Sequence, residues 1–227
     1  MKHSPDSAFA DVPDGAGFSV SEHVHAFRVP KRRFRKGNTY ALTRPEGVIL
    51  VDAVHAVTAA AVNQHLAGRR VLALLITHSD LLEQAFGPAK LMSHCFNGAP
   101  VLAHDADARA GCTALSTAED FLADLGVRAY HTPGHTPGSV LYHVLPERLL
   151  FAGDGVVGRP FGSDPGERAP THPPIAQEHW PAFVAGWMAV PEPVEAVLPL
   201  HGEPLFGPES LARAREAATQ ADNVMRE

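Results

Sequence analysis

Residues 131–154 read HTPGHTPGSVLYHVLPERLLFAGD, and this stretch decides the fold. Two Pro-Gly pairs, at 133–134 and 137–138, enclose His135 and predict two tight turns around it. Residues 139–144 then alternate small or polar side chains with apolar ones, which is typical of a half-buried strand. The sequence therefore predicts a histidine held in a rigid turn just before a strand.

A second strand follows and ends on an acid. Residues 145–148 form a hairpin connection, and the apolar residues 149–152 form the next short strand. Gly153 allows the backbone to approach a neighbour closely, and Asp154 stands at the end of the strand. Imidazole and carboxylate groups are both common metal ligands, so a histidine in a turn beside this carboxylate indicates a metal site.

Residues 131–154 resemble the second half of the signature of the metallo-β-lactamase-fold superfamily. In that family the histidine of G-H-T-x-G-S is a metal ligand and the aspartate of G-D bridges two metal ions. By resemblance these residues are His135 and Asp154. The likeness covers roughly residues 18–210 and implies an α/β fold, the four-layer αβ/βα sandwich of two facing sheets with helices outside. Residues 18–227 would form this single domain after a flexible tail of residues 1–17.

The strongest motif of the family, T-H-x-H-x-D-H at the end of a buried strand, is altered in this chain. Its place is taken by Thr77-His78-Ser79-Asp80-Leu81-Leu82-Glu83. By resemblance His78 matches the first histidine, whereas Asp80 replaces the second. Leu82 replaces the aspartate, and Glu83 replaces the last histidine. Downstream, His201 in Leu-His-Gly matches the final ligand of the family.

The resemblance implies that one metal subsite is retained and the other is lost. The first would hold one divalent ion, zinc before iron or manganese, through His78, Asp80, His135 and Asp154. The second would need Leu82, whose apolar side chain cannot bind a metal, beside Asp154 and His201, so we expect it to be empty. Whether Glu83 reaches the cleft depends on how the loop after the buried strand turns, and the sequence leaves that open.

Two functions are compatible with the altered motif. The first is a metal-dependent hydrolase similar to the glyoxalase II-like branch, with a mononuclear site in which Asp80 and Asp154 take catalytic roles. Its substrate would be a small ester, thioester, lactone or amide, with the Gly/Pro-rich loop 155–174 shaping specificity. The ligand set also resembles the superfamily's iron branch, the persulfide dioxygenases, although these keep the histidine that Asp80 replaces. The alternative is a non-catalytic binding protein whose site has decayed and holds no metal, with Asp80 only capping a helix.

Composition and charge narrow the class of protein. The chain has 227 residues, 45% of them hydrophobic, and a formal net charge of −6. This charge argues against a nucleic-acid partner, including a nuclease of the same superfamily, so we expect a small-molecule substrate. The N-terminus lacks the apolar core of a signal peptide and no apolar run approaches ~20 residues, which predicts a cytoplasmic protein without membrane contact. A homodimer is one option for assembly, and the sequence does not decide it.

The rest of the chain alternates between strand and helix patterns. Strands are predicted at 18–30 (a pair), 38–43, 47–52, 71–77, 100–104 and 194–200, the last of these as the final strand. Helices are predicted at 58–66, within 79–94, and at 118–125, 175–190 and 208–226. The basic run Lys31–Lys36 could meet a phosphate or an acidic partner, but a solvated loop or hairpin edge is the favoured interpretation. Cys95 and Cys112 are interpreted as two reduced thiols.

Overall fold

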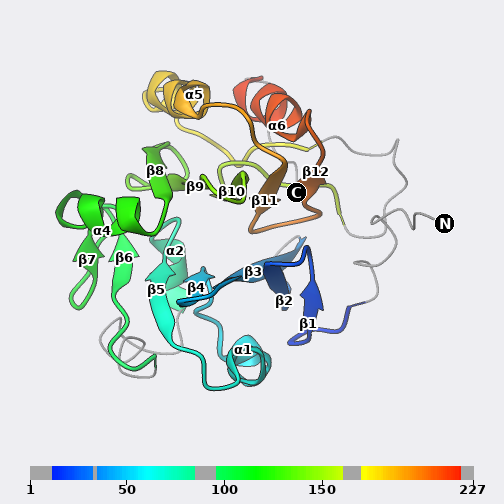
Figure 1. Ribbon diagram of the computed structural model, residues 1–227. Helices are drawn as coiled ribbons and strands as arrows, with labels where there is room; N and C mark the ends of the chain where they lie inside the picture. The colour runs from blue at the N-terminus through cyan, green and yellow to red at the C-terminus, as the bar shows by residue number, and fades with distance from the viewer. Residues whose placement is uncertain (1–11, 33–34, 85–95, 161–169, 221–227) are drawn as a thin grey trace.

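Two β-sheets face each other, and helices cover the outer face of each sheet (Figure 1). The computed structural model describes residues 12–32, 35–84, 96–160 and 170–220. Helix α1 (Ala59–Leu66) lies outside one sheet, and helices α5 (Trp180–Ala189) and α6 (Ser210–Thr219) lie outside the other. The four-layer αβ/βα sandwich expected from the sequence is therefore confirmed.

The first sheet has seven strands in the order β1-β2-β3-β4-β5-β6-β7. They are β1 (Gly17–Ser19), β2 (Val24–Arg32), β3 (Arg35–Arg44), β4 (Gly47–Val51), β5 (Val71–Leu75), β6 (Val101–Ala103) and β7 (Thr113–Ala114). Strands β1 to β4 pair antiparallel, whereas β4 to β7 pair in parallel. Parallel strands in the middle of a layered fold are covered on both faces, which explains the uninterrupted apolar sequences of β4 and β5.

The second sheet has five strands in the order β12-β11-β10-β9-β8. They are β8 (Val127–His131), β9 (Val140–Val144), β10 (Leu149–Gly153), β11 (Ala196–Pro199) and β12 (Leu205–Phe206). Only β10 and β11 pair in parallel. The carboxyl ends of β10 and β11 therefore lie together, as do those of β4 and β5, and loops from these ends can meet at one edge of the sandwich.

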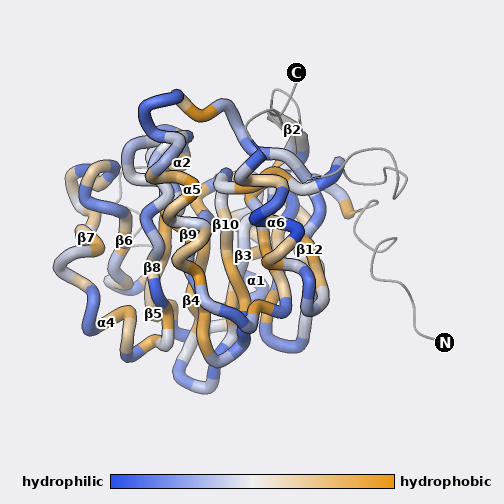
Figure 2. Tube along the Cα trace, turned by 90° about the horizontal axis from the view of Figure 1, so that it is seen from above, coloured by the Kyte–Doolittle hydropathy of each residue, from blue (hydrophilic) through white to orange (hydrophobic). Residues whose placement is uncertain are grey.

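Apolar side chains fill the space between the layers. Between the sheets pack Tyr40, Leu75, Tyr142 and Phe151, among others. The hydroxyl group of Tyr142 donates a hydrogen bond to the carbonyl oxygen of Ile76, 3.0 Å away, so this buried phenol is satisfied and also joins the two sheets. Figure 2 shows hydrophobic residues along the central strands and hydrophilic stretches in the loops around them.

Most of the elements predicted from the sequence are present, with some differences in extent. The predicted strand at 194–200 is β11, but it is not the final strand, because the short β12 follows it. The helix expected from residue 175 begins only at Trp180 as α5, with Pro181 in its first turn, where a missing N–H group costs no hydrogen bond. The helix expected within 79–94 begins at once as α2 (Asp80–Gln84), and α4 (Glu119–Asp124) matches the helix predicted at 118–125.

Several expectations fall partly or wholly outside the described residues. These are the tail up to residue 11, Arg33 and Phe34 of the basic run, Cys95, loop residues 161–169 and the end of the last helix after residue 220. The rest of the expected tail contacts β2, since the N–H group of Gly15 donates to the carbonyl oxygen of Arg28 at 2.8 Å. Lys31–Lys36 spans the connection between β2 and β3, the hairpin position that the sequence predicted. None of the helices in the described part of the chain is both long and apolar enough to span a membrane.

Candidate metal centre

The five candidate ligands come from the ends of strands in both sheets. His78 and Asp80 follow β5, and Asp80 is the first residue of α2. His135 lies in the loop between β8 and β9, where its Pro-Gly pairs place it in a turn. Asp154 follows β10, and His201 follows β11. The topology therefore collects them at the edge where the carboxyl ends of β5, β10 and β11 lie.

A single oxygen atom, Oδ2 of Asp154, lies at the centre of this group. It is 3.4 Å from Nε2 of His135 and 3.8 Å from Nε2 of both His78 and His201. Oδ2 of Asp80 is 3.4 Å from the same Nε2 of His135. His78, His135 and Asp154 offer ligand atoms that all lie within 4.8 Å of one another. The structure thus places three of the five candidates where one divalent ion could contact them all, with Asp80 next to His135 and His201 next to Asp154.

The imidazole of His78 is oriented by a buried chain of hydrogen bonds. The backbone N–H and the hydroxyl group of Thr77 donate to the two carboxylate oxygens of Asp52, each at 2.9 Å. While Asp52 is ionised, the hydroxyl proton of Thr77 is directed at it, so the hydroxyl oxygen accepts from Nδ1–H of His78, which lies 2.9 Å away. This fixes the tautomer that leaves a lone pair on Nε2, the nitrogen that faces Asp154.

Burial sets the charge states around this chain of hydrogen bonds. Burial lowers the pKa of His78 to about 4, although Asp154 acts in the opposite direction. The imidazole is therefore neutral at physiological pH, as a metal ligand must be. Burial also raises the pKa of Asp52 to about 7, against the two hydrogen bonds from Thr77. At Asp154, burial acts to raise the pKa, but the histidines 201, 78 and 135 outweigh it and the pKa is lowered.

The donor set fits a bound cation. Oδ1 of Asp154 and Nδ1 of His201 are buried and have no hydrogen-bond partner among the described residues. An ionised carboxylate that lacks part of its hydrogen bonding is costly to bury unless a positive charge compensates it. Two histidines with two carboxylates suit zinc, and also iron or manganese. That these residues bind a metal stays a prediction, but their arrangement agrees with it.

Gly153 permits the close contact between β10 and the loop that carries His78. Its φ angle is +51°, and a Cβ atom at this position would lie 2.3 Å from the hydroxyl oxygen of Thr77. The sequence predicted a close approach of the backbone here, and the neighbour is the threonine that orients His78. Any other residue would both strain the backbone and displace Thr77.

The second half of the altered motif points away from the site. Leu82 packs against the apolar cluster outside the first sheet. Glu83 forms an ion pair with Arg109, with 2.7 Å between Oε1 and Nη2. The question that the sequence left open is thereby answered, since the carboxylate of Glu83 is turned toward Arg109. Of the residues expected at the second subsite, only Asp154 and His201 face the centre.

Two buried aspartates near the centre, Asp52 and Asp107, were not predicted from the sequence to be part of the site. Asp52 was noted only as the end of a strand, and Asp107 was not considered. Asp107 accepts hydrogen bonds from the backbone on both sides of the site, at Ser79 and Gly138. The available signal was a carboxylate at the end of the buried strand 47–52 and another shortly after the buried strand 100–104, because such strand ends share one edge of a parallel sheet.

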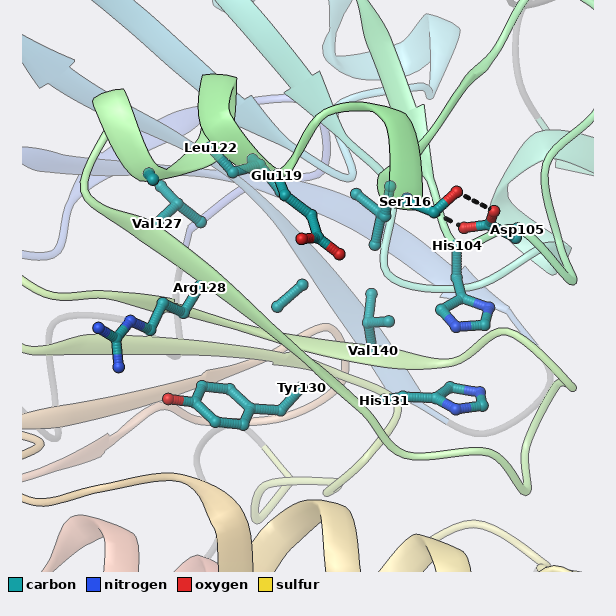
Figure 3. Close-up of a pocket in the computed structure, with 13 residues that line it drawn as sticks. His104, Asp105, Ser116, Glu119, Leu122, Val127, Arg128, Tyr130, His131 and Val140 are labelled. Atoms are coloured by element: carbon teal, nitrogen blue, oxygen red, sulfur yellow. Dashed lines mark hydrogen bonds between the residues drawn. The ribbon is translucent and has the colours of Figure 1, made fainter.

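A separate hollow of about 460 Å³ lies between α4 and β8 (Figure 3). At one end the rings of His104 and His131 stack, with their centroids 3.9 Å apart. His131 is the last residue of β8, and its Nε2–H donates to the carbonyl oxygen of Pro137 at 2.8 Å. None of the five candidate ligands lines this hollow.

Comparisons with known proteins agree with this architecture. Residues 113–209 match a family model described as the metallo-beta-lactamase superfamily. The crystal structure of DIM-1 metallo-beta-lactamase is similar with a TM-score of 0.63 and 16% identity, over 92% of this chain and 98% of that one. A metallo-beta-lactamase from Pontibacter korlensis has a TM-score of 0.60 and 15% identity, over 90% and 98%. No curated protein matches the sequence. At such low identity the structural likeness shows only the fold. The family model shows in addition that the sequence of residues 113–209 is similar to that of the superfamily.

Proposed function

We propose that this chain is a metal-dependent hydrolase of the metallo-β-lactamase superfamily with one metal ion, because residues 113–209 match the family model and the chain has the fold of that family. The ion would be held by His78, Asp80, His135 and Asp154, with zinc as the first choice. One observation carries the proposal, namely the convergence of the three Nε2 atoms around Oδ2 of Asp154, with the carboxylate of Asp80 next to His135. The substrate would be a small ester, thioester, lactone or amide, as in a glyoxalase II-like hydrolase.

Different side chains would hold the metal ion, accept a proton and contact the substrate at such a site. When bound, a divalent metal lowers the pKa of a water molecule and polarises the carbonyl group of a substrate. The Asp154 side chain is only 11% exposed and would hold the metal ion from inside the protein. The Asp80 side chain is 46% exposed and faces solvent. Substrate would therefore approach from the side of Asp80, whose carboxylate is placed to accept the proton that the attacking water loses. His201, whose Nε2 lies 3.8 Å from Oδ2 of Asp154, would face the substrate.

A metal analysis tests this proposal. Protein purified without an affinity tag should contain about one zinc, iron or manganese ion per chain when measured by inductively coupled plasma mass spectrometry. His135→Ala should lose this metal, while His23→Ala, which removes an exposed imidazole outside the site, should keep it. A panel of thioesters, lactones and amides should then be hydrolysed by the wild type and not by His135→Ala. Wild-type protein that takes up no metal after dialysis against all three ions would overturn the proposal.

A non-catalytic binding protein is the second candidate, and one observation favours it. Leu82 and Glu83, which stand where the family has ligands, serve packing and an ion pair instead. Such a change is what a binding protein on the same fold would tolerate. The two candidates differ in thermal stability, because a metal that binds only the folded state raises the melting temperature by mass action. A melting temperature that neither zinc nor a chelator changes would favour the second candidate.

A further inference from the structure

We propose that Asp107 is a positioning residue that locks together the two loops carrying His78, Asp80 and His135. The proposal rests on the proposed function, because it assigns a task to Asp107 at the same site. Asp107 lies outside the altered motif Thr77–Glu83 and is not one of the candidate ligands. Its carboxylate is 5% exposed and comes from the turn after β6, where its own N–H donates to the carbonyl oxygen of His104 at 2.8 Å.

The carboxylate of Asp107 accepts hydrogen bonds from both ligand loops. Oδ2 accepts one from the backbone N–H of Ser79 at 2.8 Å and one from the hydroxyl group of Thr136. Oδ1 accepts one from the backbone N–H of Gly138 at 2.9 Å. The N–H groups of Ser79 and Gly138 can only donate, so each oxygen of Asp107 accepts a hydrogen bond from a different ligand loop.

The positions of these donors explain what the contact controls. Ser79 lies between His78 and Asp80 in the chain, so holding its N–H group fixes the turn from which both side chains project. Thr136 directly follows His135, and Gly138 closes the same turn. One buried side chain therefore sets the distance between a loop of the seven-stranded sheet and a loop of the five-stranded sheet.

The surroundings of Asp107 are built for this contact. A Cβ atom on Gly138 would lie 2.6 Å from Cγ of Asp107, so only glycine lets the second loop come this close. Within that loop the hydroxyl oxygens of Thr136 and Ser139 are 2.9 Å apart, and the N–H group of Thr136 donates to Ser139 at 3.0 Å. The donor hydroxyl of Thr136 is thereby held in place before it meets Asp107.

A fixed position of the loop after β5 is more important for metal binding by this site than for a site whose ligands are all histidines. The carboxylate of Asp80 is shorter than the imidazole it replaces, yet its Oδ2 lies 3.4 Å from Nε2 of His135. A metal site tolerates errors of only about 0.5 Å in its ligands. We infer that the contact from Asp107 to Ser79 keeps Asp80 within reach of His135.

The test uses Asp107→Asn with Asp105→Asn as a matched control. Asparagine keeps the shape but must turn its NH₂ group toward either Ser79 or Gly138, so at least one backbone donor loses its acceptor. Asp105 lies two residues earlier on the surface and accepts its side-chain hydrogen bonds from Ser116. Zinc affinity, measured by competition with a chromogenic chelator, should fall about 10- to 100-fold in Asp107→Asn and stay unchanged in Asp105→Asn.

Hydrogen–deuterium exchange of the metal-free proteins gives a second readout that does not depend on metal. Peptides covering 77–82 and 132–139 should exchange faster in Asp107→Asn, while peptides from β3 and β10 keep wild-type rates. If Asp107→Asn does not fold, Thr136→Val removes one of the donors and should produce a smaller change of the same kind. Equal zinc affinity in Asp107→Asn and wild type, or faster exchange spread evenly over the chain, would overturn the proposal. Wild-type protein that binds no metal would overturn the hydrolase proposal instead, and the exchange pattern would still decide the role of Asp107.

Discussion

Oε1 of Glu83 lies 2.7 Å from Nη2 of Arg109, and this ion pair turns the glutamate away from Asp154. Both side chains are about half exposed, at 60% and 49%. In sequence, Glu83 stands where the family has a histidine ligand, and a carboxylate there could in principle bind a metal. The short helix α2 instead carries it to the surface, so a metal ion at this centre would have to be held by other residues.

The first prediction is that Glu83→Gln leaves metal binding unchanged. The amide removes the charge without changing the size of the side chain, and an exposed ion pair contributes only about 0.2–1 kcal/mol to stability. Asp80→Asn is the comparison, because it alters a carboxylate that faces His135 and should weaken zinc binding at least about tenfold. Chelator competition on both variants measures this. Weaker binding in Glu83→Gln, equal to that of Asp80→Asn, would restore Glu83 as a ligand.

The second prediction concerns Asp52 and the pH dependence of stability. Burial raises the pKa of Asp52 from 3.8 to about 7 in the folded protein. The folded state therefore holds this proton more tightly than the unfolded state. The stabilising contribution is complete below the unfolded pKa and is lost as the pH rises through the folded pKa. The free energy of unfolding of the wild type, relative to Asp52→Asn, should be larger at about pH 5 than at about pH 8.

Chemical denaturation in the presence of a chelator measures this difference for the metal-free protein. Asp124→Asn, which changes an exposed carboxylate on α4, provides the control. The difference in free energy of unfolding between the wild type and Asp124→Asn should be the same at about pH 5 and at about pH 8. If the relative stability of Asp52→Asn is the same at both, Asp52 is ionised throughout and the assignment of its proton is wrong.

The third prediction separates steric contact from backbone strain at Gly153. Gly153→Ala places a Cβ atom where Thr77 already lies and also strains a backbone with φ at +51°. Gly68→Ala strains a backbone with φ at +81°, but no atom lies within 4 Å of the new Cβ. Gly153→Ala should therefore be less stable than Gly68→Ala by about 1–3 kcal/mol, the usual cost of overpacking. Equal losses in urea denaturation would show that strain alone matters at Gly153.

The sequence predicted the strands around the site well, because local chemistry determines them. The Pro-Gly turns, the strand predicted at 139–144 and the apolar run 149–152 match the loop, β9 and β10 of the structure, but β9 is buried on both faces and not half-buried as its alternation predicted. The two-residue strands β7 and β12 carry no such signal. They exist only because a neighbouring strand supplies hydrogen bonds, which a local pattern cannot reveal.

At the candidate site, too, local sequence predicted some features, and contacts between distant residues determined the others. His78, His135 and His201 were found because family motifs surround each of them, and the structure places them around Asp154. The direction of Glu83 could not be predicted, because it depends on where α2 begins and on the partner Arg109. The supporting contacts join residues that are 25 and 29 positions apart, from Asp52 to Thr77 and from Asp107 to Thr136. Spacing in the sequence gives no indication of such contacts.

The last prediction is that His143→Leu stabilises the protein, most of all in acid. His143 lies in β9, is 2% exposed, and neither ring nitrogen has a hydrogen-bond partner among the described residues. Burial, with Arg128 adding to it, lowers its pKa below 6.5, so the unfolded chain binds a proton that the folded chain does not. That difference destabilises the wild type below pH 6.5 and vanishes above it.

Leucine of similar size should raise the free energy of unfolding by about 1 kcal/mol at about pH 8, and by more at about pH 5. Urea denaturation at both pH values checks this, with His23→Leu as an exposed control; a loss of stability at both would mean that the imidazole has a partner in the folded protein.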